Sequence, residues 1–481
     1  MKNSLGKNAI YKVILNVFNL LVPLFVGPYI AGLLSPEMYG VYNRVYAEFQ
    51  IFFILGAFGI YNYGVREISK VRSDEKRFGE LFTTLFVIGL LSNIIVTIIY
   101  VIYFMNRGTG IDKYVYLVMI IQMISNVFYI EFVNEAVENY EFITKKTILI
   151  RILYFVAIFA FVKKPTDVII YSVIVSMTVL VNNLVSFCYL KRKFKFDFSN
   201  IKIKRHIFPL IVALALTNVE LLYSQLDKVM LSPFVNDIAV TEYTIPTTLM
   251  AMLGTIPLSL ITVAIPRLSH YIGCGEKEKY EETLYNTTRV FMAILIPMTF
   301  GVFVLSKEIM WLYSKDVYTY AFPVLGLAAL ARIIFGYQSI QANLIMYVNG
   351  LEKQLTILLF GGGIINLILN FFLVLVNGFN AFTALFTTVL STFVFVVCVA
   401  MYSRRKLNIK CRFFCKEIVR YVLVSSTFIG VAIIVNSFHL HNFINICIEV
   451  PVCMGIYGIF MLKTKDPLID RILIKINNKK K

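Results

Sequence analysis

Long apolar stretches, each interrupted by a short polar segment, recur along the whole chain. A helix that crosses a lipid bilayer needs roughly 20 mostly apolar residues, and this length predicts about fourteen spanning helices. The expected spans are residues 9–34, 41–64, 79–105, 114–137, 144–162, 168–190, 206–232, 240–265, 284–306, 318–346, 355–376, 380–402, 417–436 and 442–462. The pattern therefore predicts an all-α integral membrane protein.

The composition excludes most soluble classes of protein. Of the 481 residues, 58% are hydrophobic and only 15% are charged, whereas a soluble globular chain has about 25% charged residues. The net charge of +18 would suggest nucleic acid in a soluble protein, but in a membrane protein it is interpreted by position. We therefore expect no nucleic-acid partner.

The basic residues are distributed unequally between alternate loops. One set of loops, which includes both chain ends, holds 33 Lys and Arg residues, and the opposite set holds 6. Cytoplasmic loops of membrane proteins collect Lys and Arg. We therefore expect both termini in the cytoplasm and an even number of spans.

The two halves of the chain carry similar short segments in the same order. Leu34-Ser35-Pro36 ends the first span and Leu231-Ser232-Pro233 ends the seventh. Six spans in each half give a parallel repeat, which in transporters encloses a cavity with alternating access. The predicted domains are a first lobe (1–197), a second lobe (198–410), and two further helices with a basic tail (411–481).

Signals for catalysis are missing from the sequence. There is no Walker A motif, and Cys411 and Cys415 have no second pair of metal ligands nearby. The outer loops are short for a membrane glycosyltransferase. We therefore expect no cofactor, no metal and no enzymatic activity, which leaves a transporter or a scaffold.

Ionisable residues at membrane depth are costly and usually face a cavity or a partner. Two explanations stay open for some of them: Arg44 and Glu48 also suit an intrahelical pair, and Arg332 also suits a pair with an acid such as Glu220. The candidates for substrate binding are Lys12, Asn16, Asn19, Arg44, Glu48, Lys228 and Arg332. The candidates for binding a coupling cation or balancing charge are Glu220, Asp227 and Glu242. The cations would favour an anion such as a diphosphate.

Four segments resemble a known family of transporters. They are YGVYNRVYAEFQIFFILGAFGIYNYGVREISK (39–70), LDKVMLSPF (226–234), IPRLSHYIGCGEKEKYEE (265–282) and GGGIINLILNFFLVLVNGFNAFTAL (361–385). Their order is similar to that in bacterial oligosaccharide flippases, the Wzx-type polysaccharide transporters of the multidrug/oligosaccharidyl-lipid/polysaccharide (MOP) exporter superfamily.

The resemblance implies a bundle of helices 1–6 and 7–12, with helices 1, 2, 7 and 8 lining the cavity and helices 13 and 14 flanking one lobe. The implied function is to move polyprenyl-diphosphate-linked oligosaccharides to the outer leaflet of the bacterial cell membrane. The implied partners are this lipid, other membrane lipids, and the polymerase and assembly proteins of a surface polysaccharide such as capsule or O-antigen. The alternatives are a cation-coupled multidrug exporter, a lipid II flippase and a membrane scaffold without transport.

Overall fold

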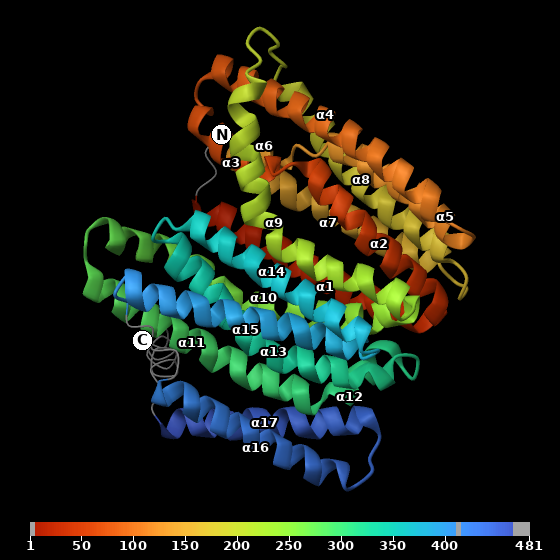
Figure 1. The fold of residues 1–481 in the computed structure, drawn as a ribbon, viewed down its shortest axis with the longest axis vertical. Coiled ribbons are helices and arrows are strands. Elements are labelled where there is room, and N and C mark those ends of the chain that lie inside the picture. The colour runs from red at the N-terminus through yellow and green to blue at the C-terminus, as the bar shows by residue number, and fades with distance from the viewer. Residues whose placement is uncertain (1–4, 410–414, 465–481) are drawn as a thin grey trace. The chain divides into compact units, whose positions relative to one another are not determined.

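The computed structural model describes residues 5–409 and 415–464, with the side chains of 5–10, 12–13, 16–17, 20 and 215–224 left out. It divides into two units, Met1–Thr241 (unit 1) and Glu242–Lys481 (unit 2). All regular structure in the described residues is helical (Figure 1). The prediction of an all-α protein is confirmed.

Unit 1 is built from nine helices and the first turn of a tenth. They are α1 (Leu5–Leu33), α2 (Pro36–Ala57), α3 (Ile60–Val71), α4 (Glu75–Arg107), α5 (Ile111–Val127), α6 (Glu131–Ala136), α7 (Tyr140–Phe161), α8 (Val168–Lys193), α9 (Ile203–Phe234) and α10 (Asp237–Gly273). Helix α2 is central in this unit because it packs against α4, α5 and α9, while α1 packs against α7 and α5 against α8.

Unit 2 contains the rest of α10 and the helices that follow it. These are α11 (Lys277–Val304), α12 (Ser306–Ser314), the short turn η1 (Thr319–Ala321), α13 (Phe322–Ile340), the π-helical segment η2 (Gln341–Tyr347), α14 (Glu352–Leu375), α15 (Ala381–Lys406), α16 (Lys416–Asn436) and α17 (Asn442–Lys463). Helix α11 packs against α13 and α16, α15 packs against α13 and α14, and α17 packs against α12 and α16.

Each of the fourteen predicted spans coincides with one or more of these helices. By length and composition, eleven helical segments in the described residues are long and apolar enough to cross a membrane. Helix α4 illustrates the expected surface, since Ile95, Ile98 and Ile102 are 57%, 56% and 57% exposed on one side of it. An exposed apolar stripe of this size suits contact with lipid.

Two predicted spans are interrupted. The span 41–64 becomes α2 and α3 because Phe58 (φ 50°) and Gly59 (φ 68°) adopt the left-handed conformation, which ends a helix. The span 114–137 becomes α5 and the short α6. Helix α2 starts at a conventional cap, where the Ser35 hydroxyl accepts a hydrogen bond from the backbone N–H of Met38 at 3.3 Å.

Buried polar side chains tie helices together inside both units. Asn43 on α2 donates to the Thr241 hydroxyl at 2.9 Å within unit 1. In unit 2, Asn366 on α14 donates to the Thr388 hydroxyl on α15 at 3.0 Å, and Gln341 at the start of η2 donates to the Val396 carbonyl on α15 at 2.9 Å. Such bonds satisfy polar groups that lipid cannot.

Candidate functional site

Arg44 on α2 is held by acids from two other helices of unit 1. Its Nη2 lies 3.0 Å from Oδ2 of Asp112 on α5, and its Nε lies 2.9 Å from Oδ1 of Asp237 in the first turn of α10. Its Nη1 donates a hydrogen bond to the Tyr116 hydroxyl at 3.4 Å. The side chain is only 12% exposed, so protein groups engage the guanidinium on three sides.

Glu48 lies one turn further along α2 and is more deeply buried. Its Oε2 accepts hydrogen bonds from the hydroxyls of Tyr103, at 3.1 Å, and Tyr116. Its Oε1 lies 3.6 Å from Nη1 of Arg107 at the end of α4. Because the Tyr116 hydroxyl contacts both Arg44 and Glu48, the two residues belong to one network that joins α2 to α4, α5 and α10.

The charge of this network limits what it can bind. Arg44 and Arg107 supply two positive charges, whereas Glu48, Asp112 and Asp237 supply three carboxylates. An incoming phosphate would have to replace an acid at Arg44, because the guanidinium already has its charged partners. The geometry is that of a structural network, and a role for Arg44 and Glu48 in binding substrate stays a prediction.

The candidates on α1 and α9 are only partly described. Spacing places Lys12, Asn16 and Asn19 on one face of α1, where Asn19 is exposed, while the side chains of Lys12 and Asn16 lie outside the described residues. On α9 the side chain of Glu220 also lies outside them. Asp227 is fully buried and Lys228 is half-buried, with the charge of Asp227 acting on it.

Arg332 and Glu242 occupy separate places in unit 2. The guanidinium of Arg332 on α13 lies against Gly254 on α10, since a Cβ at residue 254 would be 2.5 Å from its Cζ. Glu242 forms a hydrogen bond with the Tyr320 hydroxyl of η1. The structure thus places Arg332 at a close contact between α10 and α13.

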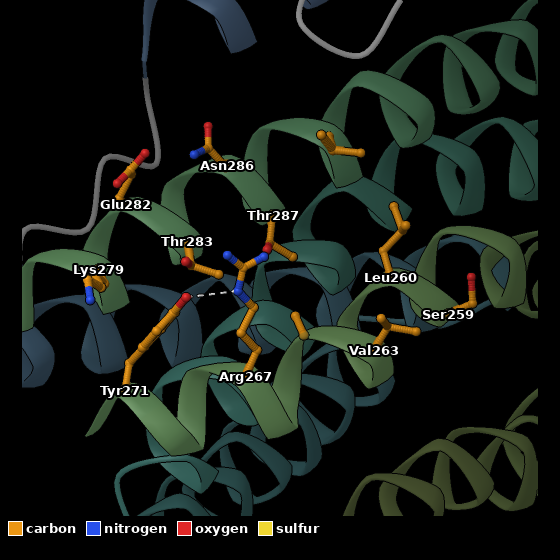
Figure 2. Close-up of a pocket in the computed structure, with 12 residues that line it drawn as sticks. Ser259, Leu260, Val263, Arg267, Tyr271, Lys279, Glu282, Thr283, Asn286 and Thr287 are labelled. Atoms are coloured by element: carbon orange, nitrogen blue, oxygen red, sulfur yellow. Dashed lines mark hydrogen bonds between the residues drawn. The ribbon is translucent and has the colours of Figure 1, made fainter. Parts of the chain in front are cut away.

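A pocket of about 570 Å³ between the end of α10 and the start of α11 was not anticipated from the sequence. Figure 2 shows the Arg267 side chain rising from α10 toward Thr283 and Thr287 on α11. The Arg267 Nε donates to the Tyr271 hydroxyl at 3.0 Å, and its Cζ lies 5.7 Å from the centre of the Tyr271 ring. Tyr271 therefore orients the exposed guanidinium along the wall of the pocket.

The lining of this pocket divides by chemical character. Lys279 and Asn286 add a second cation and an amide, and Glu282 adds one carboxylate. Lys279 also pairs with Glu276 at 2.9 Å. Leu260 and Val263 provide an apolar side. A pocket of a few hundred Å³ with convergent polar groups on an apolar wall is typical of a small-ligand site.

Two signals in the sequence could have located the pocket. Thr283 and Thr287 are four residues apart, and so are Glu282 and Asn286, which gives the start of α11 a polar face at helical spacing. Arg267 lies within the segment 265–282, which resembles a flippase motif, but a basic residue in a loop by itself indicates only the orientation of the chain.

Family models match most of the chain. Residues 5–272 match the model described as polysaccharide biosynthesis protein, and residues 209–372 match the model described as MatE. The first match alone covers more than half of the chain, with nearly all of unit 1 and of α10.

Two curated relatives match a shorter part. The chain is 23% identical over 190 residues to a protein of Escherichia coli (strain K12) named as an O-antigen transporter, a match that takes in 38% of this chain and 45% of the relative. It is 27% identical over 190 residues to a protein of Haloferax volcanii named as a low-salt glycan biosynthesis flippase, with 39% of each covered. The chain thus spans less than half the length of these relatives.

Solved structures share the fold. A lipid II flippase in an inward closed conformation superposes with a TM-score of 0.71 at 14% identity, covering 95% of this chain and 99% of that one. An inward-facing multidrug transporter of the MATE family in the MOP superfamily gives 0.61 at 13% identity, covering 83% and 98%. The predicted resemblance is confirmed: the chain belongs to the polysaccharide biosynthesis protein family, with the fold of the MOP-superfamily flippases and exporters.

Proposed function

We propose that this protein is a flippase that moves polyprenyl-diphosphate-linked oligosaccharides from the cytoplasmic to the outer leaflet of a bacterial cell membrane. The family match and the two relatives, named for O-antigen transport and for glycan biosynthesis, support a glycan-lipid substrate. The observation that carries the proposal is the α10–α11 pocket, whose groups correspond to the three chemical parts of such a substrate.

Each part of a lipid-linked sugar has a suitable partner in the pocket. The guanidinium of Arg267 can engage two phosphate oxygens at once, which makes arginine well suited to a diphosphate. Thr283, Asn286 and Thr287 offer hydroxyl and amide groups to sugar hydroxyls. Leu260 and Val263 offer an apolar surface for the first part of the prenyl chain.

The proposed orientation agrees with entry from the cytoplasm. The excess of Lys and Arg in one set of loops favours a cytoplasmic location for both termini and for the connection between α10 and α11. Arg267 would then meet the diphosphate on the side where lipid-linked sugars are made.

The other proposed contacts along the route are those expected from the sequence: Lys12, Asn16, Asn19, Arg44, Glu48, Lys228 and Arg332. The proposed acids that bind a coupling cation or balance charge are Glu220, Asp227 and Glu242.

Replacing Arg267 tests the pocket directly. In a strain that relies on this gene for its surface polysaccharide, R267A should cut polysaccharide export about tenfold or more, because the phosphate loses a charged, bidentate partner worth about 1.5–3 kcal/mol. R267K should fall between R267A and the wild type, because Lys keeps the charge but loses the planar fork.

Arg404→Ala is the matched control, since Arg404 is an exposed arginine in the last turn of α15 that does not line this pocket. Its export should stay at the wild-type level. Normal export by R267A, at wild-type amounts of protein in the membrane, would remove this pocket from the transport route. Raised drug sensitivity with normal export in a deletion strain would favour a multidrug exporter.

A further inference from the structure

Helix α17 buries its polar side. Asn445, Glu449 and Cys453 follow one another at spacings of four residues and are 3%, 0% and 7% exposed. On the other side of the helix, Met454 and Leu462 are 70% and 54% exposed. A helix in lipid that turns polar residues inward needs partners for them inside the protein.

The expected partners are missing around Glu449. Neither carboxylate oxygen of Glu449 has a hydrogen-bond partner in the part of the chain that the structure describes, and Oδ1 of Asn445 has none either. The amide Nδ2 of Asn445 is occupied, because it donates to Oδ1 of Asn436 at 3.0 Å. Three buried acceptor atoms therefore lie along one face of α17 without a donor among the described residues.

A second carboxylate approaches the same place. Glu308 lies in the first turn of α12, which packs against α17 (Figure 1), and it is 3% exposed. It lines the same cavity as Asn445, which lies one turn before Glu449 on α17. Two ionised carboxylates buried in one region of low dielectric are strongly unfavourable, and a single proton relieves both the repulsion and the desolvation.

No cation on the described parts of the packed helices is placed to neutralise the pair. Lys307 and His439 line the same cavity of about 1030 Å³ as Glu308 and Asn445, but Lys307 is exposed to solvent, as is His439. His441 packs its ring 4.9 Å from that of Trp311, and Cys453 lies one turn beyond Glu449. The residues of α11, α13, α15 and α16 that line the cavity carry no titratable group.

We propose that Glu308 and Glu449 form a proton-binding site, in which one proton resides on Glu449 and is shared with Glu308. A protonated Glu449 gains an O–H that can donate to Asn445 Oδ1 or to the Glu308 carboxylate, so it supplies the missing donor. Glu308 and Asn445 line the cavity, which gives water a path that delivers and removes the proton.

This site is separate from the features already described. It lies on α12 and α17, whereas the network around Arg44 lies in unit 1 and the pocket around Arg267 lies between α10 and α11. The test uses purified protein without any glycan lipid, so the result does not depend on the proposed function.

The orientation of the chain indicates where the proton comes from. In the proposed orientation, the turn between α16 and α17 faces outward, and the proton would come from outside the cell.

Infrared spectroscopy of the full-length protein in lipid nanodiscs detects the proton directly, because a protonated carboxyl has a C=O stretch distinct from that of a carboxylate. At neutral pH the wild type should show this band, shifted in heavy water, and E449Q should lose it. In E308Q the band should persist at a different frequency, because Glu449 stays buried but loses its charged neighbour. Glu278→Gln, at an exposed carboxyl in the first turn of α11, should leave the band unchanged.

Two outcomes would overturn the proposal. One is a wild type without the band at neutral pH, and the other is a band that E449Q leaves intact. In the first case, stabilisation by sodium chloride but not by choline chloride would make the pair a cation site. A glutamine side chain keeps the shape of glutamate and supplies an N–H donor, so E449Q should fold. If E449Q does not fold, the shift of the band in E308Q tests the proposal independently.

Discussion

The guanidinium of Arg332 on α13 fills the space that a side chain at Gly254 on α10 would need. A Cβ at residue 254 would lie 2.5 Å from Cζ of Arg332, and Gly254 is buried. Glycine at 254 therefore leaves room for Arg332, a charge that the sequence places inside a span. The two residues form one packing contact, so the effects of substitutions at residues 254 and 332 on stability should be coupled.

G254A should displace Arg332 and lower stability by about 1–3 kcal/mol, the usual cost of an overpacked contact. If Arg332 acts in transport from its present position, G254A and R332A should both reduce export strongly while the protein still reaches the membrane. Thermal unfolding and export are measured for the single and double variants.

In the R332A background, G254A should lower the free energy of unfolding by much less than in the wild type, because the atoms that clash with the new Cβ are absent. Gly301→Ala on α11 is the control, since a Cβ there meets nothing within 4 Å and alanine favours the helix. Strictly additive effects of G254A and R332A on both measurements would contradict the coupling. Normal export by R332A would remove Arg332 from the candidate contacts.

Glu48 should be the most sensitive residue of the network in unit 1. E48A leaves the buried hydroxyls of Tyr103 and Tyr116 without their charged acceptor and should destabilise the protein by about 3 kcal/mol, from two hydrogen bonds to a charged group. Thermal unfolding in detergent measures this loss. Arg107→Ala should cost less than about 1 kcal/mol, because that side chain is 46% exposed. A larger loss in R107A than in E48A would show that the ion pair, and not the phenols, holds the carboxylate.

The junction between α2 and α3 depends on glycine at position 59. Gly59 has φ 68° and a Cβ there would lie 2.5 Å from the backbone nitrogen of Leu214 on α9. G59A therefore combines backbone strain with a clash against main chain, which cannot move aside as a side chain can. We expect a loss of about 3 kcal/mol or more, measured by thermal unfolding.

Gly275, in the turn that ends α10, provides the matched comparison for G59A. It also has a positive φ, of 73°, and the backbone N–H of Glu276 donates to the Tyr271 carbonyl across it, as at a left-handed helix end, but a Cβ there meets nothing within 4 Å. G275A should lower stability only through backbone strain, by about 1 kcal/mol. Equal losses for the two variants would mean that the approach of α9 contributes nothing.

Asp167 should make stability depend on acid pH. Its Oδ2 accepts the backbone N–H groups of Lys163 at 2.9 Å and Lys164 at 2.8 Å, which holds the pKa of this carboxyl below its ordinary value. The lowered pKa contributes stability above the unfolded pKa of about 3.9, and this contribution is lost as the pH falls through the folded value. The difference in Tm between the wild type and D167N should be largest at neutral pH and shrink in acid. A difference that grows as the pH falls would reverse the sign of this argument.

The sequence predicted the helices well because lipid imposes a simple length rule. It could not place the breaks within two spans, since the left-handed turn at Phe58 and Gly59 depends on packing against α9. It also passed over α12, because Ser306, Lys307 and Glu308 interrupt the apolar pattern there. The predicted lobe boundaries and the orientation of the termini stay predictions.

The candidate site was harder to anticipate, because its partners come from distant parts of the chain. The sequence marks Arg44 and Glu48 as costly residues, but their spacing suits a pair within one helix as well as a place in a cavity. The acids that hold Arg44 lie at positions 112 and 237, and nothing in their own segments marks them as partners. The sequence identified costly residues, and the fold determined what they contact.

The central claim is that this protein moves a lipid-linked oligosaccharide across the membrane, and the leaflet position of that lipid tests it most directly. In a strain that lacks the gene, polyprenyl-diphosphate-linked repeat units should accumulate with their sugars on the cytoplasmic side, protected from a glycosidase or lectin added to intact spheroplasts. Expression of the wild type should restore access, and R267A should not. A lipid-linked pool of normal size, with sugars equally accessible from outside with and without the gene, would contradict the account.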